Sequence, residues 1–580
     1  MAILIANIGT SDLAIQLPIA GKNYYLPIDF LPDEPNLKEQ QAALTPERSR
    51  IWNNQRKYIE GEHLYQELEF EVGIKQTSRK LTEVLFNQYE ANPDYWHSRL
   101  MPVRIGGAIK KAMSLGAKKA YIFVTDQQSK NQPEGHHKDT IYLFDILDKW
   151  LKEEGWEFSL EWKIIPADIP GNDQDRMLGY YYQALNEISK AEGIDQTSSE
   201  EELVLISTKG GTNQMKMALQ IQTMAASFKN PIFLSPDLSI DGILEGKLSD
   251  CYLFSYWRYR RSQKYQTVKK LLNRWDFDGG IQILKDWVET LDSLITQGIE
   301  VETVSDNKSD IELVIKAMEI GLYCFNLDIS GAQKLIKPKQ KDNLGVVAEI
   351  KDKYYKWLNL YTQCRIYWEL NLIANFLSRM TSFCEETLHK LMGELGKKYF
   401  DQNKPNNWVL NRDIVEEKFV NYLVSTKTFN NEELKCWEAK QKGYRDYKLK
   451  NRFRKRNFVD ALIQFRGDSK EIEIWQTILQ SLKKLDYWVE KRNYMIHSAK
   501  GVSKARMSEI LDKDRKAGIE NALVACESDQ ILEEIMTINR LTCQLLNKPE
   551  TSFVDLNGRY YIYSDVKDFV IKKLMTDCLE

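Results

Sequence analysis

The residues best suited to chemistry lie near the end of the chain, in the hexapeptide RNYMIH at 492–497. The guanidinium of Arg492 can neutralise charge that develops on a phosphate, and the imidazole of His497 can move a proton near neutral pH. With no carboxylate or cysteine cluster beside them, they suit phosphodiester chemistry that needs no metal ion. Arginine is common in this chain, so a surface arginine followed by a helix-capping histidine is the alternative interpretation.

A long amphipathic helix is predicted to carry this hexapeptide. Upstream, apolar residues recur at intervals of three and four, the period of a helix with one buried stripe. If the helix continues to Gly501, Asn493 and His497 lie four residues apart on one face, where the amide can hold the imidazole. His497 then lies near the last turn, where the helix dipole favours an imidazolium. The stripe consists of Trp475, Ile478, Leu479, Leu482, Leu485, Trp488 and Val489.

Length and composition indicate an ordinary globular protein of several domains. A chain of 580 residues exceeds what a single core supports, so two or three domains are expected. Hydrophobic residues make up 43% of the chain and charged residues 28%, with a net charge of -3. Because the charges nearly cancel, any nucleic-acid site must be a local basic patch.

The cysteines and the first residues of the chain indicate the cellular compartment in which the protein is expected. The 8 cysteines are scattered, with no Cys-x-x-Cys pair and no Cys/His cluster at ligand spacing, which disfavours a zinc site or a disulfide framework. The opening segment MAILIANIG lacks a basic region and runs into a turn, as a first strand does. No apolar run approaches the length of a membrane span. We therefore expect a cytoplasmic protein.

Strands alternate with helices through the first 255 residues. This order predicts a largely parallel, doubly wound α/β sheet of the Rossmann-like type. A small hairpin is expected from 14–17 and 24–28, followed by an irregular surface excursion over 32–56. Predicted strands cover 2–8, 120–124, 158–165, 203–206, 231–234 and 251–254, and predicted helices cover 78–89, 104–115, 139–153, 176–191 and a stretch from about 214.

Three polar turns, at 9–12, 125–128 and 209–213, directly follow predicted strands. They therefore converge on the edge of the sheet where ligands bind in α/β folds. Backbone amides before a helix N-terminus form a concavity for anions, so a phosphate ligand is expected. In the third turn, Lys209 comes before the glycine pair Gly210-Gly211. This order differs from that of a Walker A loop and disfavours a nucleoside triphosphate as the ligand. A tight turn without a ligand is the alternative use of the pair. The candidate ligand-binding residues are Gly9, Thr10, Ser11, Asp126, Gln127, Lys209, Gly210, Gly211, Thr212 and Asn213.

From Tyr256 onward the strand signal stops and the chain is predicted to be helical. Amphipathic patterns cover 281–291, 311–325 and 354–392, with breaks at 276–280 and 403–407. Near the end, the pair Asn557-Gly558 lies between apolar residues within 553–563, which predicts a hairpin before a closing helix.

A basic run with interleaved aromatic residues precedes the long helix. Basic and aromatic side chains together suit single-stranded nucleic acid, through backbone charge and base stacking. A solvated helix face with aromatic residues in the core is an equally good interpretation of the run alone. The candidate RNA-binding residues are Lys450, Arg452, Arg454 and Arg456.

In their order, these motifs resemble the CRISPR-associated CARF-HEPN ribonucleases of type III systems. The similar segments are 9–12, 125–127 and 209–212 in the α/β part, and Arg492, Asn493 and His497 in the helical part. The resemblance covers the two ends of the chain and leaves the middle unassigned. It implies a CARF-like ligand-sensing domain at 1–255, a helical connecting region at 256–400 and a HEPN-like nuclease domain at 401–580.

The resemblance also implies an activity. The α/β domains of a homodimer would bind a cyclic oligoadenylate as allosteric activator, and the paired helical domains would then cleave RNA. The 2′-hydroxyl of a ribose would attack the adjacent phosphate, with Arg492, Asn493 and His497 as the motif residues and no metal ion. Two alternatives stay open. The chain would be a nucleotide-sensing regulator that binds RNA or protein without cleavage, or Thr10 and Ser11 would also promote slow cleavage of the activator, although simple ligand contacts are the favoured role.

Overall fold

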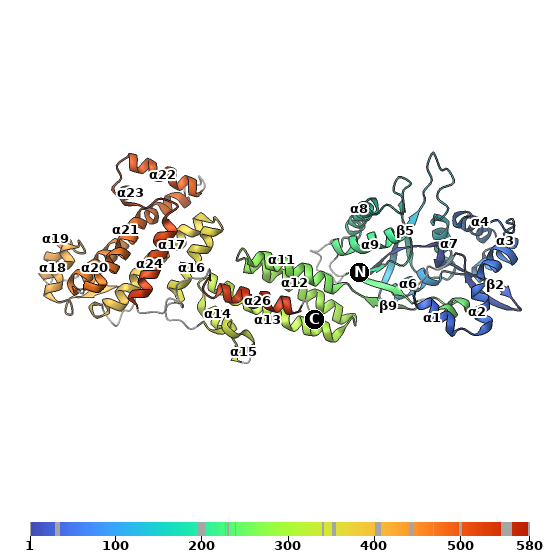
Figure 1. The fold of residues 1–580 in the computed structure, drawn as a ribbon, viewed down its shortest axis with the longest axis horizontal. Coiled ribbons are helices and arrows are strands. Elements are labelled where there is room, and N and C mark those ends of the chain that lie inside the picture. The colour runs from blue at the N-terminus through green and yellow to red at the C-terminus, as the bar shows by residue number, and fades with distance from the viewer. Residues whose placement is uncertain are drawn as a thin grey trace. The chain divides into compact units, whose positions relative to one another are not determined.

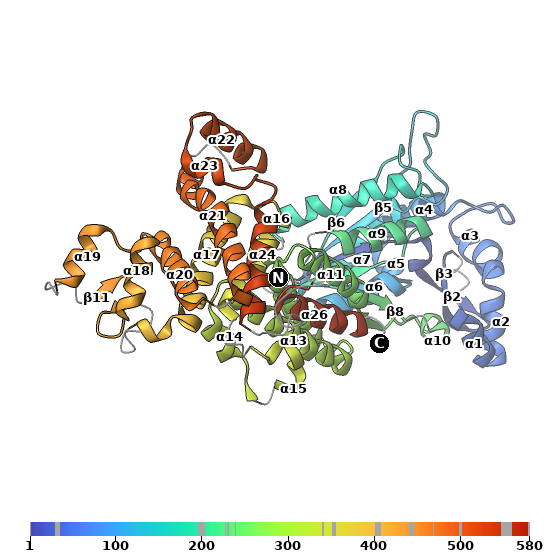
Figure 2. The same cartoon turned by 60° about the vertical axis from the view of Figure 1, so that its left-hand side comes forward.

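The computed structural model describes residues 2–29, 35–194, 203–226, 228, 231–237, 239–338, 341–350, 355–400, 408–439, 446–467, 469–497, 502–546 and 559–577. It divides into two compact units. Unit 1 comprises Met1–Gln263 and Trp287–Asp306, and unit 2 comprises Lys264–Asp286 and Asn307–Glu580. Unit 1 contains the α/β fold and unit 2 is largely helical, which confirms the predicted fold class (Figures 1 and 2). The finer division at 255 and 400 stays a prediction.

The central sheet of unit 1 has the strand order β6-β5-β1-β7-β8-β9. Its neighbours run parallel except for the antiparallel pair β8 and β9. Strand β1 lies in the middle, with Ile5 opposite Tyr121 of β5 and Ile206 of β7. The predicted strands are confirmed. Strand β1 is apolar from Ala2 to Ala6 because it is covered on both faces. The bounds are β1 Ala2–Asn7, β5 Ala117–Thr125, β6 Ser159–Ile165, β7 Leu203–Ser207, β8 Pro231–Pro236 and β9 Cys251–Phe254.

Helices cover both faces of this sheet (Figure 1). On one face, Ile3 and Ile5 pack with Met177 of α8 and Met215 of α9. Side chains alternate along a strand, so the opposite face of β1 and β5 receives α6 and α7. The helices predicted in this part are confirmed. Their bounds are α4 Ser78–Ala91, α6 Val103–Ser114, α7 Ile141–Glu153, α8 Gln174–Glu192 and α9 Asn213–Ala225.

The predicted hairpin is confirmed as β2 Ala14–Ile19 and β3 Lys22–Pro27, to which β4 Leu100–Met101 adds. The predicted irregular excursion at 32–56 is wrong in its described part, because two helices form there. Thr45 accepts a hydrogen bond from the Arg48 amide as an N-cap, and Pro46 occupies the first helical position. The remaining helical segments of this region are η1 Thr10–Asp12, α1 Pro35–Ala43, α2 Pro46–Asn53, η2 Lys57–Glu62, α3 Leu64–Glu67, α5 Pro93–His97 and α10 Ile240–Leu244.

Three helices contribute residues to both units: α11 Trp257–Leu272, α12 Phe277–Thr296 and α13 Val301–Phe325. The helices predicted at 281–291 and 311–325 are confirmed within α12 and α13. The break predicted at 276–280 is shorter than expected, because Asp276 caps α12 by accepting a hydrogen bond from the Gly279 amide at 2.9 Å. Both glycines therefore lie inside the first helical turn.

The helical pattern over 354–392 is two helices, α16 Tyr355–Glu369 and α17 Ile373–Leu395. The chain reverses at Asn371, whose φ of 56° is left-handed. Asparagine tolerates this conformation better than most residues, and the Leu372 amide closes the turn on the Tyr367 carbonyl at 2.8 Å. Apolar periodicity continues through the reversal, so it could not reveal the break.

In its described residues, the rest of unit 2 is also helical apart from one small strand pair. The final helix α26 confirms the predicted closing helix, whereas the predicted break at 403–407 and the Asn557-Gly558 turn lie outside the described residues. None of the described helices is long and apolar enough to cross a membrane. The bounds are α14 Ile329–Leu335, α15 Lys341–Leu344, η4 Gly345–Ala348, η5 Lys397–Tyr399, β10 Val409–Asn411, α18 Glu417–Ser425, α19 Asn431–Glu438, β11 Asp446–Lys448, α20 Arg452–Arg466, α21 Ser469–His497, α22 Lys504–Lys516, α23 Glu520–Val524, α24 Ile531–Leu545 and α26 Tyr563–Asp577.

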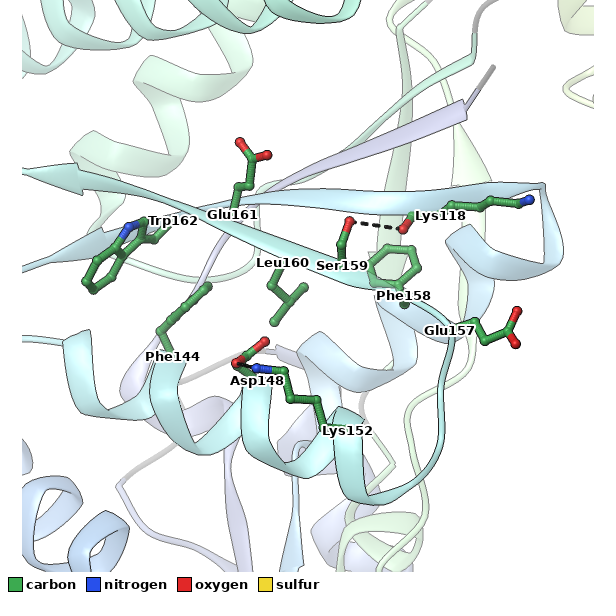
Figure 3. Close-up of a pocket in the computed structure, with 10 residues that line it drawn as sticks. All are labelled: Lys118, Phe144, Asp148, Lys152, Glu157, Phe158, Ser159, Leu160, Glu161 and Trp162. Carbon is green, nitrogen blue, oxygen red and sulfur yellow. Dashed lines mark hydrogen bonds and ion pairs between the residues drawn. The ribbon is translucent and has the colours of Figure 1, made fainter. Parts of the chain in front are cut away.

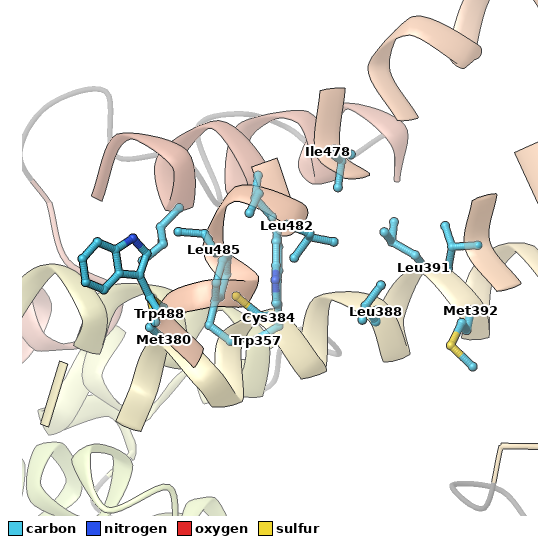
Figure 4. Packing of buried hydrophobic residues seen from close by; sticks show 14 of the residues in the cluster. Trp357, Met380, Cys384, Leu388, Leu391, Met392, Ile478, Leu482, Leu485 and Trp488 are labelled. Carbon is cyan, nitrogen blue, oxygen red and sulfur yellow. The ribbon is translucent and has the colours of Figure 1, made fainter. Parts of the chain in front are cut away.

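The core of this part forms where α21 packs on α17 (Figure 4). Leu482 and Leu485 of α21 meet Cys384 and Leu388 of α17, and Trp488 is fully buried. The stripe predicted from the sequence is therefore the buried face of α21, with Leu479 and Val489 at its partly covered margins. A helix anchored along one face holds the residues of its other face in fixed positions.

Candidate functional site

A cleft of about 550 Å³ lies at the carboxyl ends of the parallel strands in unit 1. Three chain segments that the sequence analysis singled out line it: residues 9–11 after β1, Gln127 after β5, and residues 209–213 after β7. Asp126 is the one candidate ligand residue that does not line the cleft. The three segments lie together because the carboxyl ends of parallel strands lie at the same edge of a doubly wound sheet.

The two glycine-containing turns meet because neither carries a side chain at the contact. A Cβ added to Gly210 would lie 2.3 Å from the carbonyl oxygen of Asn7, and one added to Gly9 would lie 3.1 Å from the amide nitrogen of Gly211. Gly211 also has a left-handed φ of 78°. The glycine pair therefore has a structural role, and it places the turn directly before the start of α9.

The start of α9 is fixed by Thr212. Its hydroxyl accepts a hydrogen bond from the Met215 amide at 3.2 Å and donates one to the Gly171 carbonyl. Thr212 thus joins the β7 turn to the segment around Gly171, which also lines the cleft. A helix N-terminus that opens onto a cleft favours an anionic group there.

Sequence reasoning missed several residues that line the cleft. Asp29 accepts hydrogen bonds from the hydroxyls of Thr10 at 2.6 Å and Ser78 at 3.3 Å. The cationic residues of the cleft lie in helices and loops whose sequence patterns are ordinary, so their spacing in the sequence did not indicate a binding site. The missed lining residues that are charged or titratable are Asp29, Arg104, His136, Lys138, Asp139 and Lys216.

The loop between β5 and α7 is organised by the buried carboxylate of Asp139. One of its oxygens accepts hydrogen bonds from the backbone amides of Gln127 at 2.9 Å and His136 at 2.8 Å, and pairs with Arg79 at 2.8 Å. Arg79 also reaches Asp126 at 2.9 Å. Asp126 therefore shapes this loop through an ion pair. The Gln127 side-chain amide likewise donates to backbone, to the Ile169 carbonyl at 2.9 Å.

A buried ion pair lies beneath the turn after β1. Asp12 accepts a hydrogen bond from the Gly9 amide at 2.6 Å and pairs with Nε of Arg104 at 2.9 Å. Burial raises the pKa of the Asp12 carboxyl, and Arg104 opposes this effect. Arg104 also donates a hydrogen bond to the Ser11 hydroxyl. The ion pair between Asp12 and Arg104 thus stabilises the turn that carries Thr10 and Ser11.

A second cleft of about 660 Å³ lies between α7 and the edge strand β6 (Figure 3). Its apolar lining residues include Phe144 and Trp162, whose rings stack at a centroid distance of 5.8 Å. Asp148 and Lys152 pair with each other at its rim at 2.5 Å. Although it is larger, it is away from the carboxyl ends of the strands and its paired charges are satisfied internally. The cleft after β1, β5 and β7 is therefore the better candidate for a polar ligand.

In unit 2, the predicted nuclease motif lies in the last two turns of α21. Asn493 is exposed and Arg492 is half-exposed, whereas Met495 is buried and anchors the turn. Both Nε and Nη2 of Arg492 donate to the Asn493 side-chain oxygen, at 3.1 and 2.7 Å. The helix extends to His497 as predicted. The His497 side chain lies outside the described residues, so the predicted pairing of its imidazole with Asn493 stays a prediction.

Contacts on the other side of α21 hold the motif in place. The indole nitrogen of Trp488 donates to the Cys526 carbonyl at 3.1 Å. Asp514 of α22 accepts a hydrogen bond from the Tyr487 hydroxyl at 2.9 Å and pairs with Lys491 at 2.6 Å. The residue immediately before Arg492 is thereby tied to the neighbouring helix.

The basic run before α21 is largely engaged inside unit 2. Arg452 pairs with Asp486 of α21 at 2.7 Å, and Arg456 pairs with the same carboxylate. Arg454 pairs with Glu433 at 2.7 Å. Lys450 is exposed just before α20. RNA binding by these four residues stays a prediction, in which a phosphate would compete with Asp486 and Glu433 for the arginines.

Comparisons with known proteins give one kind of match. No protein-family model and no curated protein matches the sequence. Among solved structures, the chain is similar to Enterococcus italicus Csm6 bound to cyclic hexa-2′-fluoro-hexa-dAMP, with a TM-score of 0.46 and 14% identity over 80% of this chain and 95% of that chain. Csm6 is a CARF-HEPN ribonuclease of type III CRISPR systems.

Proposed function

We propose that this chain is an endoribonuclease that a cyclic oligoadenylate switches on, acting as a homodimer on single-stranded RNA. The observation that carries the proposal is the cleft in unit 1, where residues 9–11 and 209–213 meet beside the N-terminus of α9. Backbone amides and cationic side chains around one concave site suit an anionic nucleotide. Hydroxyls and amides at the same site suit its riboses and bases.

The catalytic step is assigned to the end of α21. The ribose 2′-hydroxyl attacks the adjacent phosphorus and loses its proton, while the bond to the 5′-oxygen breaks and that oxygen gains a proton. The products are a cyclic phosphate and a 5′-hydroxyl. Arg492 would compensate the charge on the phosphate, His497 would handle a proton, and Asn493 would orient Arg492 through the hydrogen bonds between them. No metal ion is required.

A dimer is part of this proposal. One Arg492 and one His497 supply few donors to a pentavalent phosphate, and a two-fold axis would bring two copies of the motif to one RNA strand. The arginines at 452, 454 and 456 and Lys450 would guide the RNA backbone to that site. The activator would act by binding one dimer arrangement more tightly than another.

The test uses labelled RNA, a chelator, and cyclic tetra- or hexa-adenylate with the whole chain. RNA fragments that appear only with a ring support the proposal, and His497→Ala is expected to slow cleavage by at least about 100-fold while ring binding is retained. The control Lys483→Ala changes an exposed residue of the same helix and should cleave as the unchanged chain does. Ring binding without any fragments would favour the regulator that binds without cleavage. Full activity in His497→Ala would refute the catalytic assignment.

A further inference from the structure

The guanidinium of Arg104 has one nitrogen, Nη1, whose N–H groups meet no acceptor among the described residues. Arg104 lies in the first turn of α6 and is only 2% exposed. Its Nε pairs with Asp12 and its Nη2 donates to the Ser11 hydroxyl. Its Nη1 is buried and has no hydrogen-bond partner in the part of the chain that the structure describes. A charged donor left unmet in the interior is costly, so such a group calls for an explanation.

The surroundings of Arg104 indicate what would satisfy this donor. Arg104 lines the same cleft as the glycine turns and the N-terminus of α9, a helix of 13 residues. Lys138 and Lys216 line that cleft as well. A planar guanidinium with a free donor, beside a helix N-terminus, has the geometry that recognises phosphate oxygens.

We propose that Arg104 binds a phosphate of the cleft ligand through Nη1 and thereby links occupancy of the cleft to the turn at 9–12. This inference rests on the proposed function, and it adds the phosphate-binding residue and the coupling. Because Nη1 is covered, a phosphate reaches it only after a local shift, which we place at the turn that carries Ser11 and Asp12. Ser11 and Asp12 hold the other guanidinium nitrogens, so the shift changes the position of Ser11 and its neighbour Thr10.

This arrangement has the property that a ligand-driven switch needs. A ligand changes an equilibrium only by the interaction free energy that it makes in one state and lacks in the other. The Nη1 contact exists only in the shifted turn, so it contributes to that difference. In this structure the Asp12 carboxylate pairs with Nε of Arg104, so a shift of the turn and the position of the guanidinium are linked.

Arg104→Lys is the informative variant, because lysine keeps the charge opposite Asp12 but has one ammonium in place of the guanidinium fork. We expect it to weaken binding of cyclic tetra- or hexa-adenylate at least tenfold. The matched control Lys110→Ala changes an exposed residue of α6 and should alter binding less than twofold. Unchanged ring binding by Arg104→Lys would overturn the inference and leave the proposed function standing.

A second measurement separates phosphate contact from a purely structural role. Rings with neutral methylphosphonate linkages remove the charge that Arg104 is proposed to bind. The ratio of dissociation constants between Arg104→Lys and the unchanged chain should therefore fall toward one with the fully neutral ring. The same ratio for charged and neutral rings would mean that Arg104 only supports the turn, which overturns the inference.

Binding of inorganic pyrophosphate tests the phosphate contact of Arg104 without assuming that the natural ligand is a cyclic oligoadenylate. It should raise the melting temperature of the unchanged chain and of Lys110→Ala, and the increase should be lost in Arg104→Lys. If pyrophosphate behaves in this way while neither ring binds, the phosphate role of Arg104 stands and the proposed activator is wrong. If neither pyrophosphate nor a ring binds the unchanged chain, both proposals fail.

Discussion

Replacing Asp139 with asparagine should loosen the loop that closes one side of the cleft. The single carboxylate oxygen that accepts three hydrogen bonds would become an amide oxygen in the same place. Hydrogen bonds to a charged group contribute about 1.5–3 kcal/mol each and neutral ones about 0.5–1.5 kcal/mol, so each of the three weakens by about 1 kcal/mol. The new amide nitrogen would take the place of the other oxygen of Asp139, which is buried and accepts no hydrogen bond from the described residues.

The expected total is about 3 kcal/mol if the loop opens as one unit, because opening breaks all three bonds. Hydrogen exchange of the Gln127 and His136 backbone amides reports this opening directly, since both amides donate to Asp139. A loss of 3 kcal/mol corresponds to roughly 100-fold faster exchange in the regime where exchange follows the open population.

Asp126→Asn is the matched control, because Asp126 pairs with the same Arg79 but its side chain is 29% exposed. Solvent screens that pair, so its loss should cost less than about 1 kcal/mol and speed exchange less than about fivefold. Equal exchange rates in the two variants would refute the reasoning that burial of the Asp139 carboxylate organises the loop.

Two further substitutions test other contacts. Gly210→Ala would place a Cβ against the Asn7 carbonyl and should lower the free energy of unfolding by about 1–3 kcal/mol in calorimetry. The control Gly179→Ala has open space at its Cβ and should raise the free energy of unfolding by about 0.5–1 kcal/mol. Equal effects of the two substitutions would contradict the contact between Gly210 and Asn7. Burial alone would raise the pKa of Asp514, but its hydrogen bond with Lys491 lowers that pKa below the usual 3.8. The ionised carboxylate therefore stabilises the fold above about pH 4 and this contribution is lost as the pH falls through the lowered pKa. Asp514→Asn should therefore cost about 1–2 kcal/mol at pH 7 and progressively less as the pH falls below about 4 in urea titrations. A cost that does not change with pH would contradict that assignment.

Several elements could be predicted from local sequence because each depends on nearby residues. Strands β1, β5 and β7 are apolar at successive positions because helices cover both their faces. The buried face of α21 shows the helical period from Trp475 to Val489. The polar turns at the ends of these strands then follow from the parallel topology, which places all of them at one edge.

Other features depended on contacts between distant residues. The helices over 35–53 are stabilised in part by Arg48, which reaches Asp241 at 2.6 Å and Glu245 at 2.7 Å. Neither partner is visible in the local pattern. The reversal at Asn371 depends on a single backbone conformation that apolar spacing does not encode.

The sequence by itself determined the strands of the central sheet and the helices that cover it, the polar turns after β1, β5 and β7, and the hexapeptide at the end of α21. Periodicity and turn chemistry act over a few residues, so one chain suffices to read them. Only the tertiary structure decided that Arg104 and Asp139 support the cleft, and that Arg452 and Arg456 share the carboxylate of Asp486. These partners are separated by tens of residues, or reach backbone amides whose position depends on the folded loop. Buried charge selects its partners in three dimensions, which sequence spacing does not record.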